Sequence, residues 1–511
     1  MAGGASWARR GRRPVARPGR TRRGLRAGLV LLVALCLAGL GLLPTSLAAF
    51  SATTSGPASS FTARATFGLT QTATPPCLND NGSGGCAAAT GIIQGESVVI
   101  SPDGKNVYVG SVGSSTNSGV AEFSRNATTG ALTQLGGNDK CASNGTVTGC
   151  TPFPGALYYV YDLAISPDGK HVYATGFASD TIVSFSRNAS TGALTPIAGV
   201  NKCLYDSTQS SPPANCNPAA RHIDGADGVV VSPDGAFVYV TSYNSDSLTV
   251  YARDATTGAL TQLAGTAGCI TNTSVSNCAL GVGLNMPDFV RMSPDGTSLY
   301  VTSNKSSTVA VFQRNPTTGV LTQAADPNAC LYDTAVAGIN GCKAATGISG
   351  AYYVAIAPNG RTAYVTGKSG DTIAQFTRNT STGVLTQLAS PNACLHLSGG
   401  SAPPGCGSSA RGINGPTWVT FSDDGLFAFV SAASSYAVAA FRHNNTTGVL
   451  TQITGTSGCI SNVGSEGCAA GSALKFANAL TISPDGRDVY VVGGDTQGSD
   501  EGYLAVLNAT H

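Results

Sequence analysis

Ser232-Pro-Asp-Gly-Ala-Phe-Val-Tyr-Val-Thr241 is the stretch of sequence that decides the fold. Pro-Asp-Gly favours a tight turn, and the β-branched and aromatic run from Phe237 to Thr241 predicts the strand that follows it. The same four-residue turn begins at Ser101, Ser166, Ser293 and Ser483, with degenerate copies at Ala357 and Ser422. Successive turns begin 61 to 66 residues apart, so the chain is an array of seven repeats.

Each repeat contains four short runs with the composition of strands. In the first repeat these are Glu96–Ile100, Asn106–Val109, Val120–Ser124 and Ala131–Leu135. Turn residues separate them, and no stretch shows sustained helical periodicity. Four strands repeated seven times predict an all-β, seven-bladed β-propeller with four-stranded blades.

The two ends of the array complement each other. Six repeats carry Thr-Gly-(Ala/Val)-Leu-Thr at the start of the fourth strand, whereas the last repeat stops at Leu507-Asn-Ala-Thr-His511. A matching strand, Phe67-Gly-Leu-Thr-Gln71, lies at the other end of the array. We therefore expect the N-terminal strand to complete the last blade and close the ring, which leaves no open sheet edge. The propeller then spans residues 61–511.

Residues 1–48 have the pattern of an export signal. Nine arginines precede an uncharged apolar run from Ala27 to Leu43, and Ser46-Leu-Ala48 places small residues where a signal peptidase cuts. An uncleaved N-terminal anchor is the alternative, because the apolar run is close to the length of a membrane span. Residues 49–60 form a short linker. The sequence thus predicts a secreted or otherwise extracytoplasmic protein with no membrane span once the signal is removed.

The composition excludes several classes of protein. Charged residues make up 11% of the chain, and without the nine N-terminal arginines 20 basic residues face 27 acidic ones. This balance excludes a coiled coil, a charged disordered chain and a binder of nucleic acid. We expect a monomer whose partner is a small molecule, a carbohydrate or a protein.

Fourteen cysteines after the signal form seven pairs with partners 9 to 13 residues apart. Each pair lies between the fourth strand of one blade and the first strand of the next. An exported chain meets an oxidising compartment, so the pairs predict seven local disulfides. Zinc is the alternative, but structural zinc sites need closer cysteines and nearby histidines. The predicted bonds are Cys77–Cys86, Cys141–Cys150, Cys203–Cys216, Cys269–Cys278, Cys330–Cys342, Cys394–Cys406 and Cys459–Cys468.

Ser-Pro-Asp-Gly followed by Val-Tyr-Val-Thr resembles the propeller repeats named YVTN. It also resembles the wider lactonase-like, seven-bladed superfamily that includes 6-phosphogluconolactonase. The resemblance covers residues 61–511 and implies the propeller fold. Its implication for activity is a lactonase-like hydrolase, although the superfamily also contains surface proteins. The active-site positions of the sugar-phosphate enzyme have no residue-by-residue match in this chain.

One register position of the repeat is expected at the mouth of the central channel. It lies five residues before each turn serine, and an aliphatic position follows two residues later. The mouth position is occupied by Glu96, Tyr161, Asp227, Asp288, Tyr352, Thr417 and Asn478. Glu96, Asp227 and Asp288 are candidate general acids and bases on a lactone or ester. Tyr161, Tyr352 and Asn478 are candidate ligand contacts, and solvated polar residues at a wet mouth are the alternative.

Loops on the cysteine side supply three further candidates. His222 is the one histidine considered as a base, because it precedes Asp227 closely. Arg221 and Arg411 occupy matching places in two blades and could clamp an anion, with a solvated loop as the alternative.

Residues repeated in register are assigned to the scaffold. An arginine recurs at the end of the third strand, and we expect it to pair with the aspartate of the turn. These arginines are Arg125, Arg187, Arg253, Arg314, Arg378 and Arg442. His171, His443 and His511 are expected to be solvated.

Two functions remain open. The first is a disulfide-stapled propeller that binds a ligand or partner at the face carrying the cysteine loops, without catalysis. The second is a lactonase-like hydrolase that uses Asp227, Asp288, Glu96 and His222. No cofactor is required by either, and calcium is the ion that the mouth oxygens and Asn478 would suit.

Overall fold

A computed structural model describes residues 68–210, 212–214, 216–494 and 501–510 of the chain. Contacts divide the chain into Met1–Ala63 and Arg64–His511. The predicted signal (1–48) and linker (49–60) lie outside the described residues, as does His511. No helix in the described part of the chain is long and apolar enough to span a membrane.

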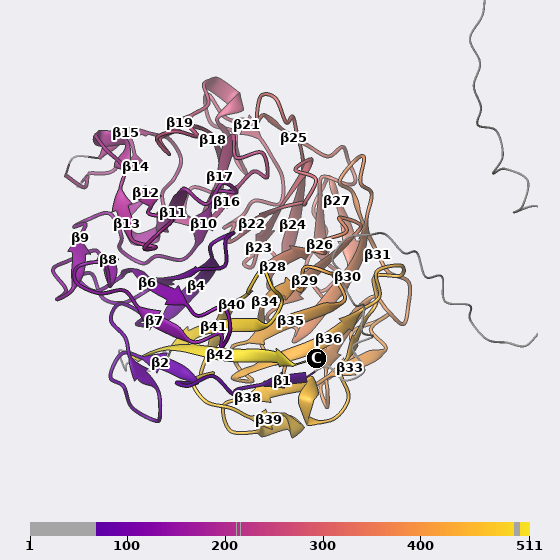
Figure 1. The fold of residues 1–511 in the computed structure, drawn as a ribbon. Helices are drawn as coiled ribbons and strands as arrows, with labels where there is room; N and C mark the ends of the chain where they lie inside the picture. The colour runs from indigo at the N-terminus through magenta and orange to yellow at the C-terminus, as the bar shows by residue number, and fades with distance from the viewer. Residues whose placement is uncertain (1–67, 211, 215, 495–500, 511) are drawn as a thin grey trace, which may run out of the picture. The chain divides into compact units, whose positions relative to one another are not determined.

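Seven sheets, each built mainly of antiparallel strands, follow one another around a common centre (Figure 1). The strand nearest the centre of each sheet is the one that leads into the Pro-Asp-Gly turn or its variant. These inner strands are β4 (Gly95–Ile100), β10 (Leu163–Ile165), β16 (Ala226–Val231), β22 (Val290–Met292), β28 (Ala351–Ile356), β34 (Pro416–Phe421) and β40 (Ala477–Ile482).

The second and third strands continue each sheet outwards by hairpin connections. The second strands are β5 (Asn106–Ser111), β11 (His171–Gly176), β17 (Phe237–Ser242), β23 (Ser298–Ser303), β29 (Thr362–Gly367), β35 (Phe427–Ala432) and β41 (Asp488–Gly494). The third strands are β6 (Gly119–Arg125), β12 (Thr181–Arg187), β18 (Ser247–Arg253), β24 (Thr308–Arg314), β30 (Thr372–Arg378), β36 (Ala437–His443) and β42 (Gly502–Thr510).

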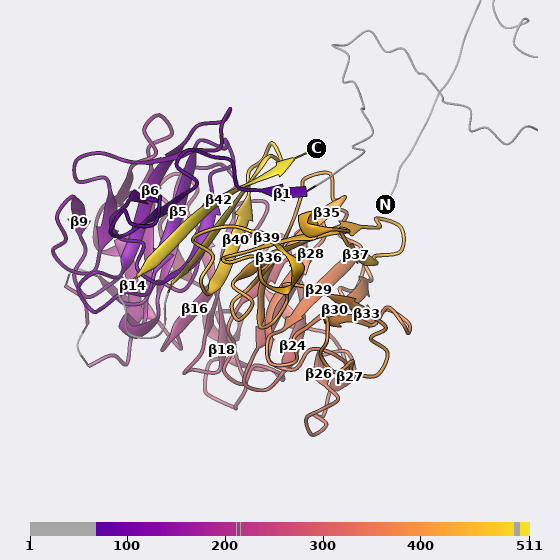
Figure 2. The same ribbon diagram turned by 90° about the horizontal axis from the view of Figure 1, so that it is seen from below.

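A short fourth strand pairs with the end of the third one. In chain order these strands are β1 (Gly68–Thr70), β7 (Leu132–Gln134), β13 (Leu194–Pro196), β19 (Leu260–Gln262), β25 (Leu321–Gln323), β31 (Leu385–Gln387) and β37 (Leu450–Gln452). β1 pairs antiparallel with β42, with Leu69 opposite Ala509. The last sheet therefore contains strands from both ends of the described chain, which lie side by side in Figures 1 and 2.

The prediction of four-stranded blades was wrong, because each sheet has six strands. The cysteine segment itself folds into two short parallel strands, the first of which pairs with the start of the third strand. These pairs are β2 (Cys77–Asn79) with β3 (Ala87–Ala88), β8 (Cys141–Ser143) with β9 (Cys150–Pro152), β14 (Cys203–Asp206) with β15 (Asn217–Ala220), β20 (Cys269–Thr271) with β21 (Ala279–Leu280), β26 (Cys330–Asp333) with β27 (Cys342–Ala345), β32 (Cys394–Leu397) with β33 (Ser408–Ala410), and β38 (Cys459–Ser461) with β39 (Ala469–Ala470). All seven predicted disulfides are formed within these segments.

Helical structure in the described residues is limited to five single 3₁₀ turns. They are η1 (Phe177–Ser179), η2 (Val200–Lys202), η3 (Gly265–Ala267), η4 (Thr456–Gly458) and η5 (Ser465–Gly467). The aliphatic ring predicted two residues after the mouth position is buried core, with every side chain at most 3% exposed. Its members are Val98, Leu163, Val229, Val290, Val354, Val419 and Leu480.

Neighbouring sheets are joined by an ion-pair cluster that we call the turn clasp. Arg187 at the end of β12 donates to Asp103 in the preceding sheet (2.9 Å) and to the Tyr108 hydroxyl (3.1 Å). Tyr108 in turn donates to the carbonyl oxygen of Gly192 (2.6 Å). Both side chains are buried, so the tyrosine of the repeat motif is part of the joint between sheets. Equivalent turn clasps are built by Arg125 with Asp485 and Tyr490, Arg253 with Asp168 and Tyr173, Arg314 with Asp234 and Tyr239, and Arg378 with Asp295 and Tyr300.

The assignment of Arg442 to this series was wrong by one residue. His443 occupies the clasp position, since Phe441 stands two residues before it, and Arg442 is exposed. His443 is buried and bonds to the carbonyl oxygen of Gly425 (2.6 Å). His171 is also buried, with Nδ1 2.7 Å from Arg253, so the prediction that these two histidines are solvated was wrong.

Candidate functional site at the channel mouth

The inner strands bulge at the mouth position, and the threonine of the repeat motif fixes the bulge. In β16 the pairing register shifts between Ala226 and Val229, which frees the backbone amide of Gly228. That amide donates to Thr241 Oγ1 (2.9 Å), while the Thr241 hydroxyl donates to the carbonyl oxygen of Asp288 in the next sheet. Bulges of this kind redirect side chains. The motif threonine therefore holds the mouth backbone of two adjacent sheets.

Three carboxyl groups predicted for the mouth come together there from different sheets. Asp227 and Asp288 are 5% and 8% exposed, and Glu96 is half-buried. Asn478 donates to Glu96 (3.1 Å), and the amide of Asn304 donates to Asp288 (2.7 Å). Asp227 differs, because its Oδ1 is buried and has no hydrogen-bond donor among the described residues.

The proton affinities of these carboxyls are raised by their surroundings. Burial raises the pKa of Glu96 to about 7 and that of Asp288 to about 7, although Lys368 opposes both shifts. Burial raises the pKa of Asp227 well above its usual range, and the nearby Asp288, Asp162 and Glu96 charges add to the shift. Carboxyls whose pKa is raised in this way are candidates for general acids and bases at neutral pH.

Lys368 is the cation of the mouth, and it was not among the site residues predicted from the sequence. Its ammonium lies 3.9 Å from the centre of the Tyr352 ring, a cation–π contact. Burial lowers the pKa of Lys368, whereas the charges of Glu96 and Asp288 oppose that shift. Lys368 thus places a positive charge beside two of the three carboxyls.

Beneath the mouth, an ion pair crosses the channel. Arg291 in β22 donates to the fully buried Asp162 (2.9 Å) and to the Tyr353 hydroxyl (2.8 Å). Its guanidinium lies 4.6 Å from the Tyr353 ring centre and 4.8 Å from that of Trp418, and these two rings stack. This cross-channel strut forms the floor of the mouth.

Aromatic side chains border the carboxyls on one side. Phe177 in η1 contacts Tyr161 edge-on, with ring centres 5.0 Å apart, and Tyr243 at 5.9 Å. Burial raises the pKa of Tyr243, and the charges of Asp288 and Asp227 raise it further, which places this ring beside them. Tyr161, Phe177 and Tyr243 form what we call the aromatic wall.

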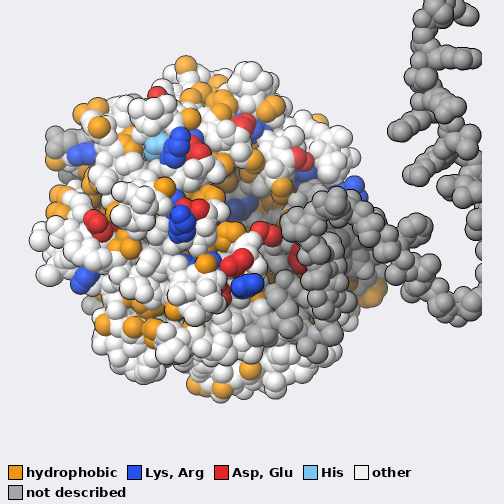
Figure 3. All heavy atoms as spheres, viewed as in Figure 1, with side chains coloured by type: hydrophobic (Ala, Val, Ile, Leu, Met, Phe, Trp, Pro, Cys, Tyr) orange, Lys and Arg blue, Asp and Glu red, His pale blue; other side chains and the backbone are white. Residues whose placement is uncertain are grey.

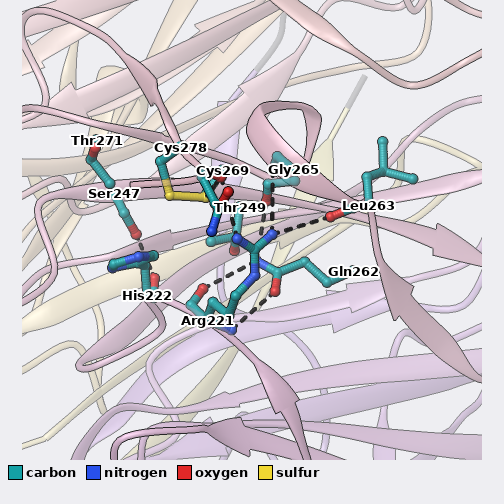
Figure 4. Close-up of a disulfide and its surroundings, with 12 residues drawn as sticks. Arg221, His222, Ser247, Thr249, Gln262, Leu263, Gly265, Cys269, Thr271 and Cys278 are labelled. Atoms are coloured by element: carbon teal, nitrogen blue, oxygen red, sulfur yellow. Dashed lines mark hydrogen bonds between the residues drawn. A yellow bond between two sulfur atoms is a disulfide. The ribbon is translucent and has the colours of Figure 1, made fainter. Parts of the chain in front are cut away.

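His222 lies beside a disulfide, and not among the mouth carboxyls (Figure 4). Its backbone has a positive φ of 58°, and its carbonyl oxygen accepts from Ser247 (2.6 Å). In four other repeats the corresponding position, directly before a buried Ile or Leu, is a glycine that also has a positive φ: Gly91, Gly283, Gly347 and Gly412. Sequence proximity to Asp227 was misleading because the connection turns sharply between the two residues.

Arg221 and Arg411 serve the scaffold. Arg221 donates to the carbonyl oxygens of Asn277 (3.2 Å), Leu263 and Gly265 (both 3.3 Å), next to the Cys269–Cys278 bond (Figure 4). Arg411 makes the same contacts with Gly467 and Gly455 (both 2.6 Å). Each arginine ties a cysteine loop to its own sheet, and the two do not share a ligand site.

The fit of a metal ion was assessed from the convergence of ligand atoms. In the described ranges, the one trio of His, Cys or acidic ligand atoms within 4.8 Å of one another is His222 with Cys269 and Cys278. The three mouth carboxyls do not converge in this way, and Lys368 lies beside two of them. Calcium binding by the mouth stays a prediction.

Comparison with known proteins agrees with this architecture. Residues 61–203 and 210–337 match the family described as lactonase, 7-bladed beta-propeller. The chain belongs to this family. A 6-phosphogluconolactonase of Formosa agariphila is 33% identical over 108 residues, which are 21% of this chain and 25% of that protein. The match thus spans a quarter of that relative.

Solved propellers resemble the lactonase-family chain more distantly. A periplasmic gluconolactonase of Pseudomonas aeruginosa is 17% identical, with 70% of this chain and 83% of that one covered and a TM-score of 0.45. A protein from Lactobacillus plantarum is 19% identical, with 77% and 89% covered and a TM-score of 0.46.

Proposed function

We propose that this lactonase-family propeller binds a small ester-containing molecule at the channel mouth and hydrolyses it, with a lactone as the substrate class. The observation that carries the proposal is the buried Asp288 carboxyl beside Lys368 at the mouth. Burial raises the pKa of Asp288 to about 7, although Lys368 opposes the shift. A carboxyl with such a pKa can accept a proton and return it at the same pH.

In the proposed reaction, the Asp288 carboxylate accepts a proton from the attacking water as its oxygen bonds to the lactone carbonyl carbon. Asp288 then returns this proton to the ring oxygen as the bond between that oxygen and the carbonyl carbon breaks. Lys368 places positive charge where the carbonyl oxygen becomes negative. The product is the open hydroxy acid, and protons and charges balance without a cofactor.

The test is hydrolysis of a panel of sugar and acyl lactones by the purified chain, followed by proton release. We expect turnover that rises with pH through about 7 as Asp288 ionises, and that falls by 10²-fold or more in Asp288→Asn, in line with the usual contribution of a general base. Asp224→Asn is the control, because Asp224 is not one of the three mouth carboxyls and its side chain accepts from the Asn244 side chain. Parallel assays with calcium and with EDTA test the predicted ion. No turnover of any lactone, or full activity in Asp288→Asn, would refute the proposal.

Binding without hydrolysis is the second candidate, and the aromatic wall favours it. Tyr161, Phe177 and Tyr243 offer ring surface beside polar groups, the usual composition of a ligand pocket. A ligand that protects the protein against unfolding yet is recovered unchanged would select this function.

We also infer an extracytoplasmic location from seven disulfides, since such bonds persist in oxidising compartments. Nucleic acid is not among the expected partners. Acidic and basic side chains form small mixed groups on the face shown in Figure 3, which gives no broad basic patch among the described atoms in that view.

A further inference from the structure

Among the described side chains of the mouth, the Asp227 carboxyl has a buried oxygen without a hydrogen-bond partner. Its side chain is 5% exposed, and Oδ1 meets no hydrogen-bond donor within the described ranges. A buried polar atom without a partner costs free energy, and native proteins contain few of them. An external donor that occupies the mouth would remove this cost.

The charges around Asp227 indicate the sign of that donor. Arg291 is committed elsewhere, because its nitrogens donate to Asp162, to the Tyr353 hydroxyl and to the carbonyl oxygen of Val290. Lys368 acts on Glu96 and Asp288. The mouth therefore holds three carboxyls against one lysine, and within the described ranges Asp227 forms no ion pair, although the charge of Arg291 opposes the rise of its pKa.

The aromatic wall supplies the second half of a cation site. Burial and the charges of Asp227 and Asp288 raise the pKa of both Tyr161 and Tyr243. The Phe177 ring contacts both tyrosine rings. Aromatic faces attract ammonium groups, most strongly where water is excluded. The chain shows this preference across the mouth, where the Lys368 ammonium lies 3.9 Å from the Tyr352 ring centre.

We propose that the mouth recognises an organic cation, with Asp227 as its counter-charge and Tyr161, Phe177 and Tyr243 as its wall. This inference rests on the proposed function for the location of the site and adds the substrate class: an ester or lactone that carries an ammonium group. A phosphorylated or otherwise anionic substrate is disfavoured by the three carboxyls.

Cation binding should release protons, because it favours ionised carboxyls whose pKa burial raises. Affinity should therefore increase between pH 6 and pH 8. The titratable and charged groups that face this part of the mouth are Glu96, Asp162, Asp288, Tyr161, Tyr243, Tyr352, Arg291 and Lys368.

The test compares three probes of similar shape on the full chain by isothermal titration calorimetry: tert-butylammonium, tert-butanol and pivalate. We expect tert-butylammonium to bind at least tenfold more tightly than the neutral and anionic probes, with proton release near pH 7 in buffers of different ionisation enthalpy. Asp227→Asn should lower its affinity by about tenfold or more, as expected when a buried charge partner is lost. Phe177→Leu should lower it by about 2- to 30-fold, the range of a cation–π contact.

The matched control is Tyr436→Leu. Tyr436 contacts Phe476 edge-on (4.9 Å) in an aromatic pair of other sheets, so its loss should leave the affinity unchanged. Equal binding of tert-butanol or pivalate, or unchanged affinity in both Asp227→Asn and Phe177→Leu, would overturn the inference. The tert-butylammonium probe has no ester bond to hydrolyse, so tight cation binding without lactone turnover would refute only the proposed hydrolysis.

Discussion

Replacing Glu122 by glutamine should stabilise the protein at neutral and alkaline pH. Glu122 lies in β6, is 1% exposed and accepts from the backbone amide of Leu194 in the next sheet (2.8 Å). Burial raises its pKa from the ordinary 4.5 to about 9, and the charge of Asp139 adds to the shift while the Leu194 bond opposes it. The repeat contains its own precedent: Gln375, also 1% exposed, accepts in the same way from Leu450 (2.7 Å).

The sign and size of the effect follow from proton linkage. Below pH 4.5 both the folded and the unfolded chain carry the proton on Glu122, so the folded state has no penalty there. Between pH 4.5 and about 9 the unfolded chain loses the proton first, and stability falls by about 1.4 kcal/mol for each pH unit. At pH 7 the folded state is therefore destabilised by about 3 kcal/mol, a penalty that the Glu122→Gln variant avoids.

The assay is guanidinium unfolding of the wild type, Glu122→Gln and Gln375→Glu at pH 5, 7 and 9. The gain of Glu122→Gln over the wild type should increase with pH. The reverse variant, Gln375→Glu, should acquire the same pH-dependent loss at the matched site. Parallel stability curves for all three proteins across this pH range would refute the reasoning.

Three further predictions concern the scaffold. Arg253→Met removes the buried partner of Asp168, whose own side chain is 33% exposed, and should cost about 2–3 kcal/mol in guanidinium unfolding; a loss below 1 kcal/mol would contradict the role of the clasp. Gly412→Ala should cost about 1–2 kcal/mol by the same measurement, because φ is +70° and the new Cβ would lie 3.2 Å from Cys459 Cβ, and no loss would show that the loop yields. Dithiol reduction of the seven disulfides should lower the melting temperature strongly, since each closed loop contributes about 2–3 kcal/mol, and an unchanged melting temperature would count against that contribution.

Features repeated in register could be predicted from the sequence. The turn, the sheet, the disulfide, the aliphatic position and the mouth position each recur once in every repeat, so the pattern of one repeat predicts the others. The mouth carboxyls Asp227 and Asp288 could be predicted for this reason, since they share a register position in adjacent sheets. Their raised pKa values could not be predicted, because these depend on burial and on charges from several sheets.

Features that break the repeat could not be predicted in this way. The Asp162–Arg291 strut joins residues 129 positions apart that occupy different register positions. Lys368 comes from a loop, where the sequence carries no periodic signal. The two strands in each cysteine segment are two to four residues long, too short for alternation to show. His222 was expected near Asp227, but His222 itself has a left-handed backbone conformation and its side chain lies beside the Cys269–Cys278 disulfide.

The turn clasps also determine where this ring is mechanically weakest. Five arginines bind across successive seams, including the seam where Arg125 in the first sheet meets Asp485 in the last. The sixth sheet has no such arginine on either side: His443 stands at one seam, and Ala509 occupies the clasp position at the other. A ring under load opens at its least reinforced joint. We therefore expect amide exchange to begin in β34 to β39, with the sixth sheet hinging out as a unit while its neighbours stay clasped.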